Sequence, residues 1–328
     1  MKVLFIGGTG NISVSVSKLA VERGFDLYLL NRGKQDVTIP GAKTITADIK
    51  QPAQMEAALR DHEFDVVVNW IAFTELDVEQ DISLFSGRCG QYIFISSASV
   101  YQKPLLHPVI TESTPLHNPY WQYSRNKIAC EERLTRAYRE DGFPMTIVRP
   151  SHTYDTRIPI GVGNWASYII PKRMLEGKPV IVHGDGTSLW TLTHSEDFAR
   201  GFVGLIGHPQ SIGQAFHITS DFLQNWNQIY EQIGDALGVK PKLVHIASEF
   251  IAEVDPESAP GLIGDKIYSG IFDNSKIKRY VPEFVATIPF HIGIRRTIAW
   301  YQADASRMEV SPDDDAQFER ILAAYQKA

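Results

Sequence analysis

The 328-residue sequence predicts an α/β protein built on a doubly wound parallel sheet. Two observations favour this fold class. Through the first half of the chain, short runs of Val, Ile and Leu without polar alternation are separated by longer amphipathic stretches. A glycine-rich turn, Gly7-Gly8-Thr9-Gly10, follows the first apolar run and opens the first amphipathic stretch. Strands that are apolar on both faces belong in a parallel sheet covered by helices.

The elements of this sheet follow in order along the chain. The expected strands are Val3–Ile6, Leu27–Leu30, Thr44–Thr46, Val66–Asn69, Tyr92–Ser96 and Thr146–Arg149. The helices expected between them are Ile12–Arg23, Pro52–Asp61, Val78–Ser86 and Tyr123–Asp141. After Arg149-Pro150 the pattern loosens, but a helix over Ser195–Ile206 and a strand over Ala215–Ile218 are predicted to rejoin the sheet. We therefore expect residues 1–150, with 190–220, to form the first domain.

Residues 151–189 and 221–328 are expected to form a smaller mixed lobe that binds substrate. The acidic stretch Ser311–Asp315 is interpreted as the solvated start of a last helix, because carboxylates favour helix N-termini.

Composition excludes several classes of protein. The charged fraction of 21% is that of a globular chain, and a net charge of −6 argues against a nucleic-acid partner. Cys89 and Cys130 are too few for a disulfide framework, which favours a reducing compartment. The first apolar run is too short for a signal peptide, and no run approaches the ~18 residues of a membrane span. A cytoplasmic protein is predicted. No metal site is predicted, because the histidines lack ligand-like spacing.

The glycine-rich turn predicts a Rossmann-type dinucleotide site, because it lies between a strand and a helix. Gly7 permits the tight turn, and Gly10 lets the backbone approach a pyrophosphate at the helix N-terminus. Ser13 stands where a third glycine is usual. The other residues of the turn expected to bind cofactor are Thr9, Asn11 and Ile12.

The end of the second strand, Asn31-Arg32, lacks the acidic residue that binds the ribose hydroxyls of NAD. Arg32 could instead bind a 2′-phosphate, which favours NADP, although Asn31 could bond a free hydroxyl. Asp48 and Ile49 follow the third strand, where an adenine pocket is expected. Asp48 could equally cap the helix near Pro52.

Tyr123 and Lys127 lie four residues apart on a predicted helix and therefore share one face. A nearby ammonium favours the phenolate, so we expect a lowered Tyr123 pKa and a role as general acid or base. A chain with 13 Tyr should contain about one such pair by chance, so the pair alone could be an ordinary helix-surface contact.

Three features, Gly7-x-x-Gly10, the cluster Ser96–Tyr101 and Tyr123-x-x-x-Lys127, occur together in order. In this combination the chain, from Met1 to about Ile218, resembles the extended short-chain dehydrogenase/reductases, which include NAD-dependent sugar epimerases and dehydratases. In detail, Phe94–Tyr101 and Tyr123–Glu131 resemble a branch that includes chloroplast stem-loop-binding proteins and uncharacterised bacterial relatives.

The resemblance implies roles for individual residues. Tyr123 would transfer a proton, and Lys127 would lower its pKa and bond the nicotinamide ribose. Ser97 would orient the substrate hydroxyl, with Ser99 as a second candidate. Residues at the end of the fourth strand would contact the nicotinamide half: Trp70, Ile71 and Ala72.

Two departures from the family pattern concern the substrate. Ala98 and Ser99 stand where sugar-nucleotide dehydratases carry an Asp-Glu pair, which argues against dehydration. Trp190 stands where relatives carry an Arg for the diphosphate, and an indole can stack on a base or sugar but cannot neutralise that charge. The cations Arg157, Lys172 and Arg173 could replace it or simply be solvated on the surface.

The function expected from these features is NAD(P)-dependent oxidation, reduction or epimerisation of a sugar or sugar-nucleotide by hydride transfer. The alternative is a non-catalytic binding protein with the same fold, for RNA or regulation, against which the −6 charge and the intact Ser97, Tyr123 and Lys127 set count. A small-molecule substrate is the expected partner, and the resemblance makes a homodimer possible.

Overall fold

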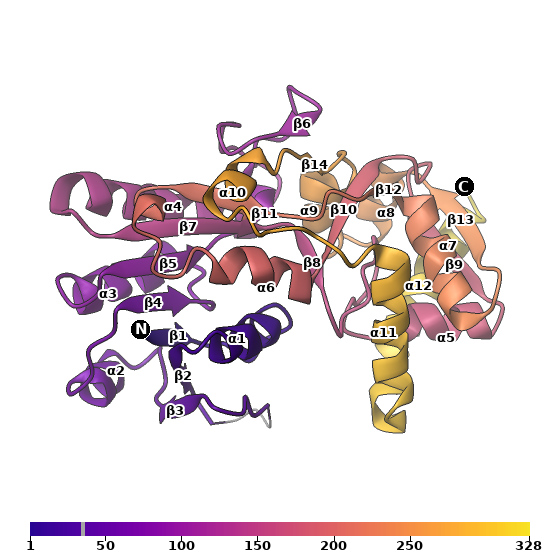
Figure 1. Cartoon of the computed structure of the whole chain (residues 1–328). Coiled ribbons are helices and arrows are strands. Elements are labelled where there is room, and N and C mark those ends of the chain that lie inside the picture. The colour runs from indigo at the N-terminus through magenta and orange to yellow at the C-terminus, as the bar shows by residue number, and fades with distance from the viewer. Residues whose placement is uncertain (34–36) are drawn as a thin grey trace.

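The computed structural model describes residues 1–33 and 37–328, and these form two lobes. The first lobe holds a seven-stranded parallel sheet with strand order β11-β7-β5-β4-β1-β2-β3 (Figure 1). Its strands are β1 (Lys2–Ile6), β2 (Asp26–Asn31), β3 (Lys43–Thr46), β4 (Val66–Asn69), β5 (Gln91–Ile95), β7 (Met145–Pro150) and β11 (Ala215–Ile218). The predicted α/β class and doubly wound parallel sheet are confirmed.

Helices cover both faces of this sheet, as the apolar strands require. One face packs against α1 (Ser13–Glu22), α6 (Ser195–Val203) and α10 (Ser275–Tyr280). The other packs against α2 (Pro52–Leu59), α3 (Glu75–Phe85) and α4 (Gln122–Asp141). Every predicted strand and helix of this lobe is present, and most ends differ from the prediction by one to three residues.

Helix α3 begins three residues before the predicted start at Val78 because of a capping box. The Thr74 hydroxyl accepts a hydrogen bond from the Asp77 backbone N–H, and the Asp77 carboxylate accepts one from the Thr74 N–H at 2.9 Å. The predicted start was wrong because the apolar periodicity begins only at Val78, whereas the cap acts one turn earlier.

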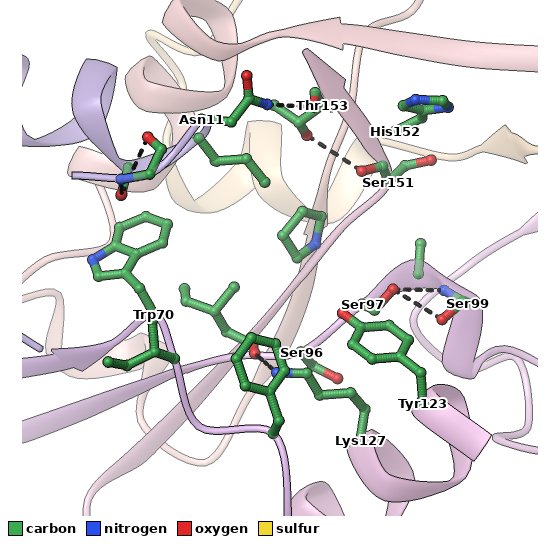
Figure 2. A pocket seen from close by; sticks show the side chains of 18 of the residues that line it. Asn11, Trp70, Ser96, Ser97, Ser99, Tyr123, Lys127, Ser151, His152 and Thr153 are labelled. Atoms are coloured by element: carbon green, nitrogen blue, oxygen red, sulfur yellow. Dashed lines mark hydrogen bonds between the residues drawn. The ribbon is translucent and has the colours of Figure 1, made fainter. Parts of the chain in front are cut away.

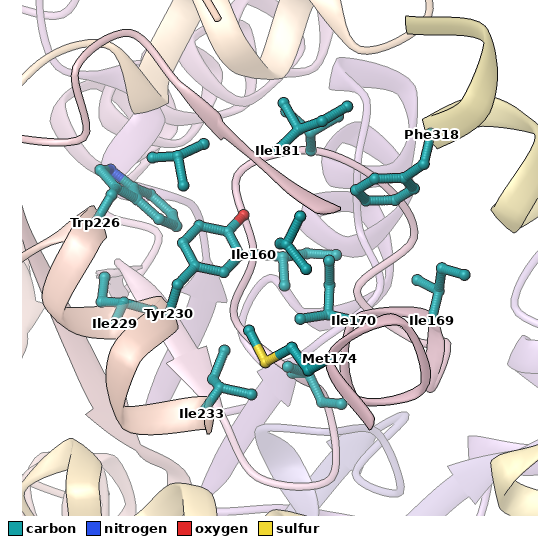
Figure 3. Close-up of a cluster of buried hydrophobic side chains, with 14 of the residues drawn as sticks. Ile160, Ile169, Ile170, Met174, Ile181, Trp226, Ile229, Tyr230, Ile233 and Phe318 are labelled. Carbon is teal, nitrogen blue, oxygen red and sulfur yellow. The ribbon is translucent and has the colours of Figure 1, made fainter. Parts of the chain in front are cut away.

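The second lobe has its own core, in which Trp226, Tyr230 and Phe318 are fully buried (Figure 3). Residues 189–194, which include part of the segment expected to rejoin the main sheet, instead form the middle strand of the three-stranded sheet β12-β10-β8. The remaining strands are β6 (Val109–Ile110), β8 (His152–Tyr154), β9 (Pro179–His183), β10 (Leu189–His194), β12 (Leu223–Asn225), β13 (Lys242–Ile246) and β14 (Ile271–Phe272).

Helices of this lobe pack around the small sheets, and short helical turns connect the elements. The helices are α5 (Ile169–Leu175), α7 (Trp226–Leu237), α8 (Ser248–Val254), α9 (Ala259–Gly261), α11 (Phe290–Gln302) and α12 (Pro312–Tyr325). The turns are η1 (Ala98–Val100), η2 (Pro209–Ser211), η3 (Leu262–Lys266) and η4 (Ala305–Met308). The acidic stretch does begin the last helix, with Ser311 as its N-cap.

Two further features bear on function class. No helix in the described part of the chain has the length and apolar character needed to cross a membrane. Both cysteines are free thiols, and burial raises the pKa of each to about 12. Neither thiol is therefore activated as a nucleophile.

Candidate active site

A cavity of about 990 Å³ opens at the carboxyl ends of β1, β2, β4, β5 and β7 and extends into the second lobe. In doubly wound sheets this edge is where ligands bind. Residues from the glycine-rich turn, the serine cluster, α4 and the second lobe all line the same space. The motifs that lie more than a hundred residues apart in the sequence therefore meet at one site.

The glycine-rich turn has the backbone that a dinucleotide requires. Gly7 has φ of +94° and Gly8 of +95°, which favour glycine. A Cβ on Gly7 would lie 3.2 Å from the Trp70 Cβ, whereas a Cβ on Gly10 would meet only the Ser13 hydroxyl, at 3.5 Å. That hydroxyl accepts a hydrogen bond from the Gly10 N–H at 2.8 Å. The turn thus presents open backbone at the start of α1, as a pyrophosphate site needs.

All five residues expected in the turn line the cavity: Gly7, Thr9, Gly10, Asn11 and Ile12. The Asn11 amide donates to the Thr153 carbonyl at 3.2 Å, which links the turn to the second lobe.

The predicted adenine end also lines the cavity, with Asn31, Arg32, Asp48 and Ile49. The Asn31 carboxamide oxygen accepts from the Gly33 N–H at 2.9 Å. Asp48 accepts from the Lys50 N–H at 3.0 Å, and the N-cap of α2 is Gln51. The alternative interpretation of Asp48 as the helix cap is therefore wrong.

Lys127 is buried on α4 and links the ends of two strands. Its ammonium donates to the Ala72 carbonyl at 2.6 Å and the Ile95 carbonyl at 2.7 Å. It also lies 4.5 Å from the centre of the Phe73 ring and 5.9 Å from that of Tyr123. Burial lowers the pKa of Lys127 to about 8. Ala72, expected to contact cofactor, is buried and does not line the cavity, so its observed role is to hold Lys127 through its carbonyl.

The pKa of Tyr123 does not shift as expected. Burial raises it above the usual value, a hydrogen bond with Ser97 lowers it in part, and the charge of Asp265 raises it further. The expectation that Lys127 lowers the pKa of Tyr123 is therefore wrong. Burial is the largest cause, and the Lys127 ammonium is held by two backbone carbonyls rather than by the phenol.

The serine cluster meets Tyr123 at the same wall of the cavity (Figure 2). The Ser97 and Ser99 hydroxyl oxygens lie 2.9 Å apart, and the Ser124 hydroxyl donates to that of Ser99 at 2.8 Å. Ser99 is therefore held by Ser97 and α4, whereas Ser97 lines the cavity beside Tyr123. This arrangement suits Ser97 to orient a substrate oxygen near the phenol.

The turn after β4 places Trp70 and Ile71 in the lining of the cavity. Hydrogen bonds that lead to a buried carboxyl group hold this turn in place. Asp81 accepts hydrogen bonds from the Asn69 amide and the Tyr92 hydroxyl, both at 2.5 Å. The Asn69 carboxamide oxygen in turn accepts from the Ile71 N–H at 2.8 Å. The sequence analysis missed this network, because nothing in the spacing of these residues marks them as neighbours.

Asp81 should make the stability of the protein pH-dependent. Burial raises its pKa from 3.8 to about 7, so the folded state binds more protons than the unfolded state between these values. The contribution of Asp81 is therefore full below about pH 4 and is lost as pH rises through about 7. We expect Asp81→Asn to flatten the fall in melting temperature between about pH 5 and pH 8. Melting temperatures of the natural protein and Asp81→Asn at several pH values measure this change, and Asp61→Asn, at an exposed position, is the control. An unchanged slope in Asp81→Asn would contradict the assignment.

The second lobe closes the far end of the cavity with aromatic and charged side chains. Trp190 lines it, as predicted, and its indole N–H donates to the His152 Nδ1 at 3.0 Å. The described residues that line the cavity do not include Arg157, Lys172 or Arg173, the cations proposed to replace the missing Arg. Arg173 is instead fully buried in ion pairs with Asp315 and Glu319, so the surface interpretation is also wrong for it.

Several lining residues had no signal in the sequence. They are Phe73, Lys103, Trp165, Asp265 and Lys266. The last two come from η3, a single π-helical turn outside the matched motifs, and only the folding of the second lobe brings them to the cavity. π-Helical turns occur frequently at functional sites, which is the one signal that the backbone offers.

The parallel sheet, the glycine-rich turn and the Ser–Tyr–Lys group define a dinucleotide-dependent enzyme of Rossmann type. Residues 3–219 match the family model described as "NAD dependent epimerase/dehydratase family", and the chain belongs to this family. It is accordingly an NAD-dependent enzyme of the epimerase and reductase type. The predicted family and enzyme class are confirmed.

Individual relatives are distant. The chain is 22% identical to 2'-dehydrokanamycin reductase of Streptomyces kanamyceticus over 87% of this chain and 80% of that protein. It is 25% identical to the chloroplast stem-loop binding protein of 41 kDa b of Arabidopsis thaliana, over 74% and 65%. It is 31% identical to UDP-glucose 4-epimerase of Lactobacillus helveticus, over 45% and 51%.

Solved structures share the fold across both lobes. UDP-glucose 4-epimerase of Bifidobacterium longum, in complex with NAD+ and UDP, superposes with a TM-score of 0.76 at 18% identity, covering 94% of this chain and all of that one. The UDP-glucose 4-epimerase of Thermus thermophilus, in complex with NAD, has a TM-score of 0.73 at 17% identity, covering 92% and 99%.

Proposed function

We propose that this protein oxidises or reduces a hydroxyl-bearing carbon of a sugar-like substrate, with Tyr123 transferring the hydroxyl proton. The observation that carries the proposal is that Ser97, Tyr123 and Lys127 line the same cavity as the glycine-rich turn. The reductase and epimerase relatives support the same reaction type.

The nicotinamide coenzyme, when bound, supplies the group that accepts or donates hydride. Gly7, Gly10 and the start of α1 would hold its pyrophosphate, and Lys127 its nicotinamide ribose. Ser97 would bond the substrate oxygen and keep it beside the Tyr123 hydroxyl. The phenol would give or take the proton as that oxygen becomes a hydroxyl or a carbonyl. Dehydration would need a further acid and base beside Tyr123. Ala98 and Ser99, which occupy the positions of the Asp-Glu pair of dehydratases, cannot supply them.

The proposal is tested by incubating the protein with NAD or NADP and a panel of sugars that includes glucose, glucuronate and UDP-glucose. Reduced nicotinamide, followed by absorbance, reports oxidation, and sugar isotope exchange reports epimerisation. Turnover with at least one sugar is expected. Strong, salt-dependent RNA retention without turnover would instead favour the binding-protein alternative.

We also propose a preference for NADP over NAD. Arg32 lines the adenine end of the cavity, where a guanidinium can bind a 2′-phosphate, and Asn31 is already bonded to Gly33. Arg32→Ala should weaken NADP binding by about tenfold, or about 1.4 kcal/mol, and leave NAD binding unchanged. Calorimetric titration of each coenzyme measures both affinities, with the exposed Arg60→Ala as control. An unchanged NADP affinity would disprove the phosphate contact.

A homodimer through α4 is a further proposal. This helix is 20 residues long and carries the partly exposed Tyr138 on its outer face. Light scattering of the protein measures the mass, and a monomeric mass would contradict the dimer.

A further inference from the structure

Beyond Ser97 and Tyr123, the cavity ends in a group of side chains that we call the distal subsite: His152, Trp190 and Lys266. They come from β8, β10 and η3, three segments that the second lobe brings together. Trp165 also lines the cavity, with its ring centre 5.9 Å from that of His152. None of these residues takes part in the coenzyme contacts or proton transfer described above, so their place in the cavity points to substrate selection.

His152 is held in one neutral form. The Trp190 indole N–H can only donate, so the Nδ1 that accepts from it carries no proton. The neutral ring therefore carries its proton on Nε2. Burial, together with the charge of Lys266, lowers the pKa of His152 to about 3, which keeps it neutral at physiological pH. His152 thus offers a fixed N–H donor and no acceptor.

Lys266 is the cation of the subsite. Its backbone is held in place, since its carbonyl accepts a hydrogen bond from the His183 Nε2 at 3.1 Å. Within the described chain, its ammonium has no ion pair or hydrogen bond, whereas the neighbouring Lys103 is 3.5 Å from the Asp265 carboxylate. Burial lowers the pKa of Lys266. Because Lys266 lines the cavity, its ammonium can pair with an anionic ligand bound there.

We propose that the distal subsite binds a single carboxylate on a polyhydroxylated ring, with Lys266 and the His152 Nε2–H as donors. The proposal rests on the proposed function and names the substrate class of the same cavity. Two donors of this kind suit one carboxylate, and the indole of Trp165, which is 42% exposed, provides flat apolar surface for a sugar ring.

A nucleotide diphosphate fits the subsite less well. It carries at least two negative charges and is commonly bound by the bidentate fork of Arg. Among the described residues that line the cavity, the one Arg is Arg32, at the opposite, coenzyme end. The second lysine of the far part, Lys103, is already paired with Asp265. A single charge remains for the ligand, which argues for one carboxylate.

The test compares D-glucuronate with D-glucose, which share a ring and differ by a carboxylate in place of a hydroxymethyl group. Binding to the coenzyme-loaded protein is measured by titration calorimetry. We expect glucuronate to bind about tenfold more tightly than glucose. In Lys266→Met this preference should disappear, in Lys266→Arg it should persist, and in the exposed control Lys242→Met it should be unchanged.

Equal affinity for the two sugars, absence of glucuronate binding, or an unchanged preference in Lys266→Met would overturn the proposal. Tighter binding of UDP-glucose than of glucuronate would overturn it in favour of a diphosphate ligand. Coenzyme titration of each variant separates this failure from that of the proposed function. Coenzyme affinity should be the same in Lys266→Met and the natural protein, whereas a protein that binds no coenzyme would contradict the proposed function itself.

Discussion

Replacing Tyr123 by Phe should reduce hydride transfer by about 10²- to 10⁴-fold, the usual contribution of a positioned acid or base. The phenyl ring keeps the packing of Tyr123 against Trp121 and Phe73, whose ring centres lie 5.0 and 6.4 Å away. Only the hydroxyl, which lies in the cavity lining beside Ser97, is lost. Coenzyme affinity should therefore change by less than about threefold, since 1.4 kcal/mol corresponds to tenfold.

Turnover is measured with the sugar of the panel that the natural protein converts, and coenzyme affinity by calorimetry. Tyr138→Phe is the matched control, because it removes a phenol from the partly exposed face of the same helix. If Tyr123→Phe retains full turnover, Tyr123 is not the proton-transferring group. A parallel loss of turnover and coenzyme affinity would indicate a binding role instead.

Breaking the buried ion pair between Arg149 and Glu131 should destabilise the fold by about 3–5 kcal/mol, because the remaining charge would be left without a partner. The Arg149 Nε lies 2.9 Å and its Nη2 2.6 Å from the two Glu131 oxygens, and both side chains are at most 5% exposed. Ser96 also donates to Glu131, so the pair lies directly beneath the serine cluster. Urea unfolding of Arg149→Met measures the loss.

The double variant Arg149→Met with Glu131→Leu should be more stable than Arg149→Met alone, because it leaves no buried charge. The more exposed pair Arg133–Glu79, which joins α4 to α3, provides the control, and Arg133→Met should cost no more than about 1 kcal/mol. Similar losses in Arg149→Met and Arg133→Met would show that burial does not govern the cost.

The strand ends expected in the main sheet agree with the structure to within one residue, because apolar runs and a glycine-rich turn are local signals. Gly7 has a positive φ, which is a backbone requirement that a tight strand-to-helix turn imposes. Tyr123 and Lys127 share a face because four residues make about one helical turn. By contrast, the direction of the Tyr123 pKa shift depends on burial and on Asp265, which is far away in the chain and invisible to spacing.

The sequence by itself determined the sheet, the coenzyme turn and the family, since each depends on residues that are close together in the chain. It also indicated, through Ala98 and Trp190, that the substrate side departs from the family pattern. Only the tertiary structure decided which charged side chains line the cavity near Trp190. Arg173 is buried in the second lobe and paired with Asp315, whereas His152 and Lys266 line the cavity from separate segments. Such long-range contacts are set by the packing of the two lobes, and no local pattern of residue types encodes them.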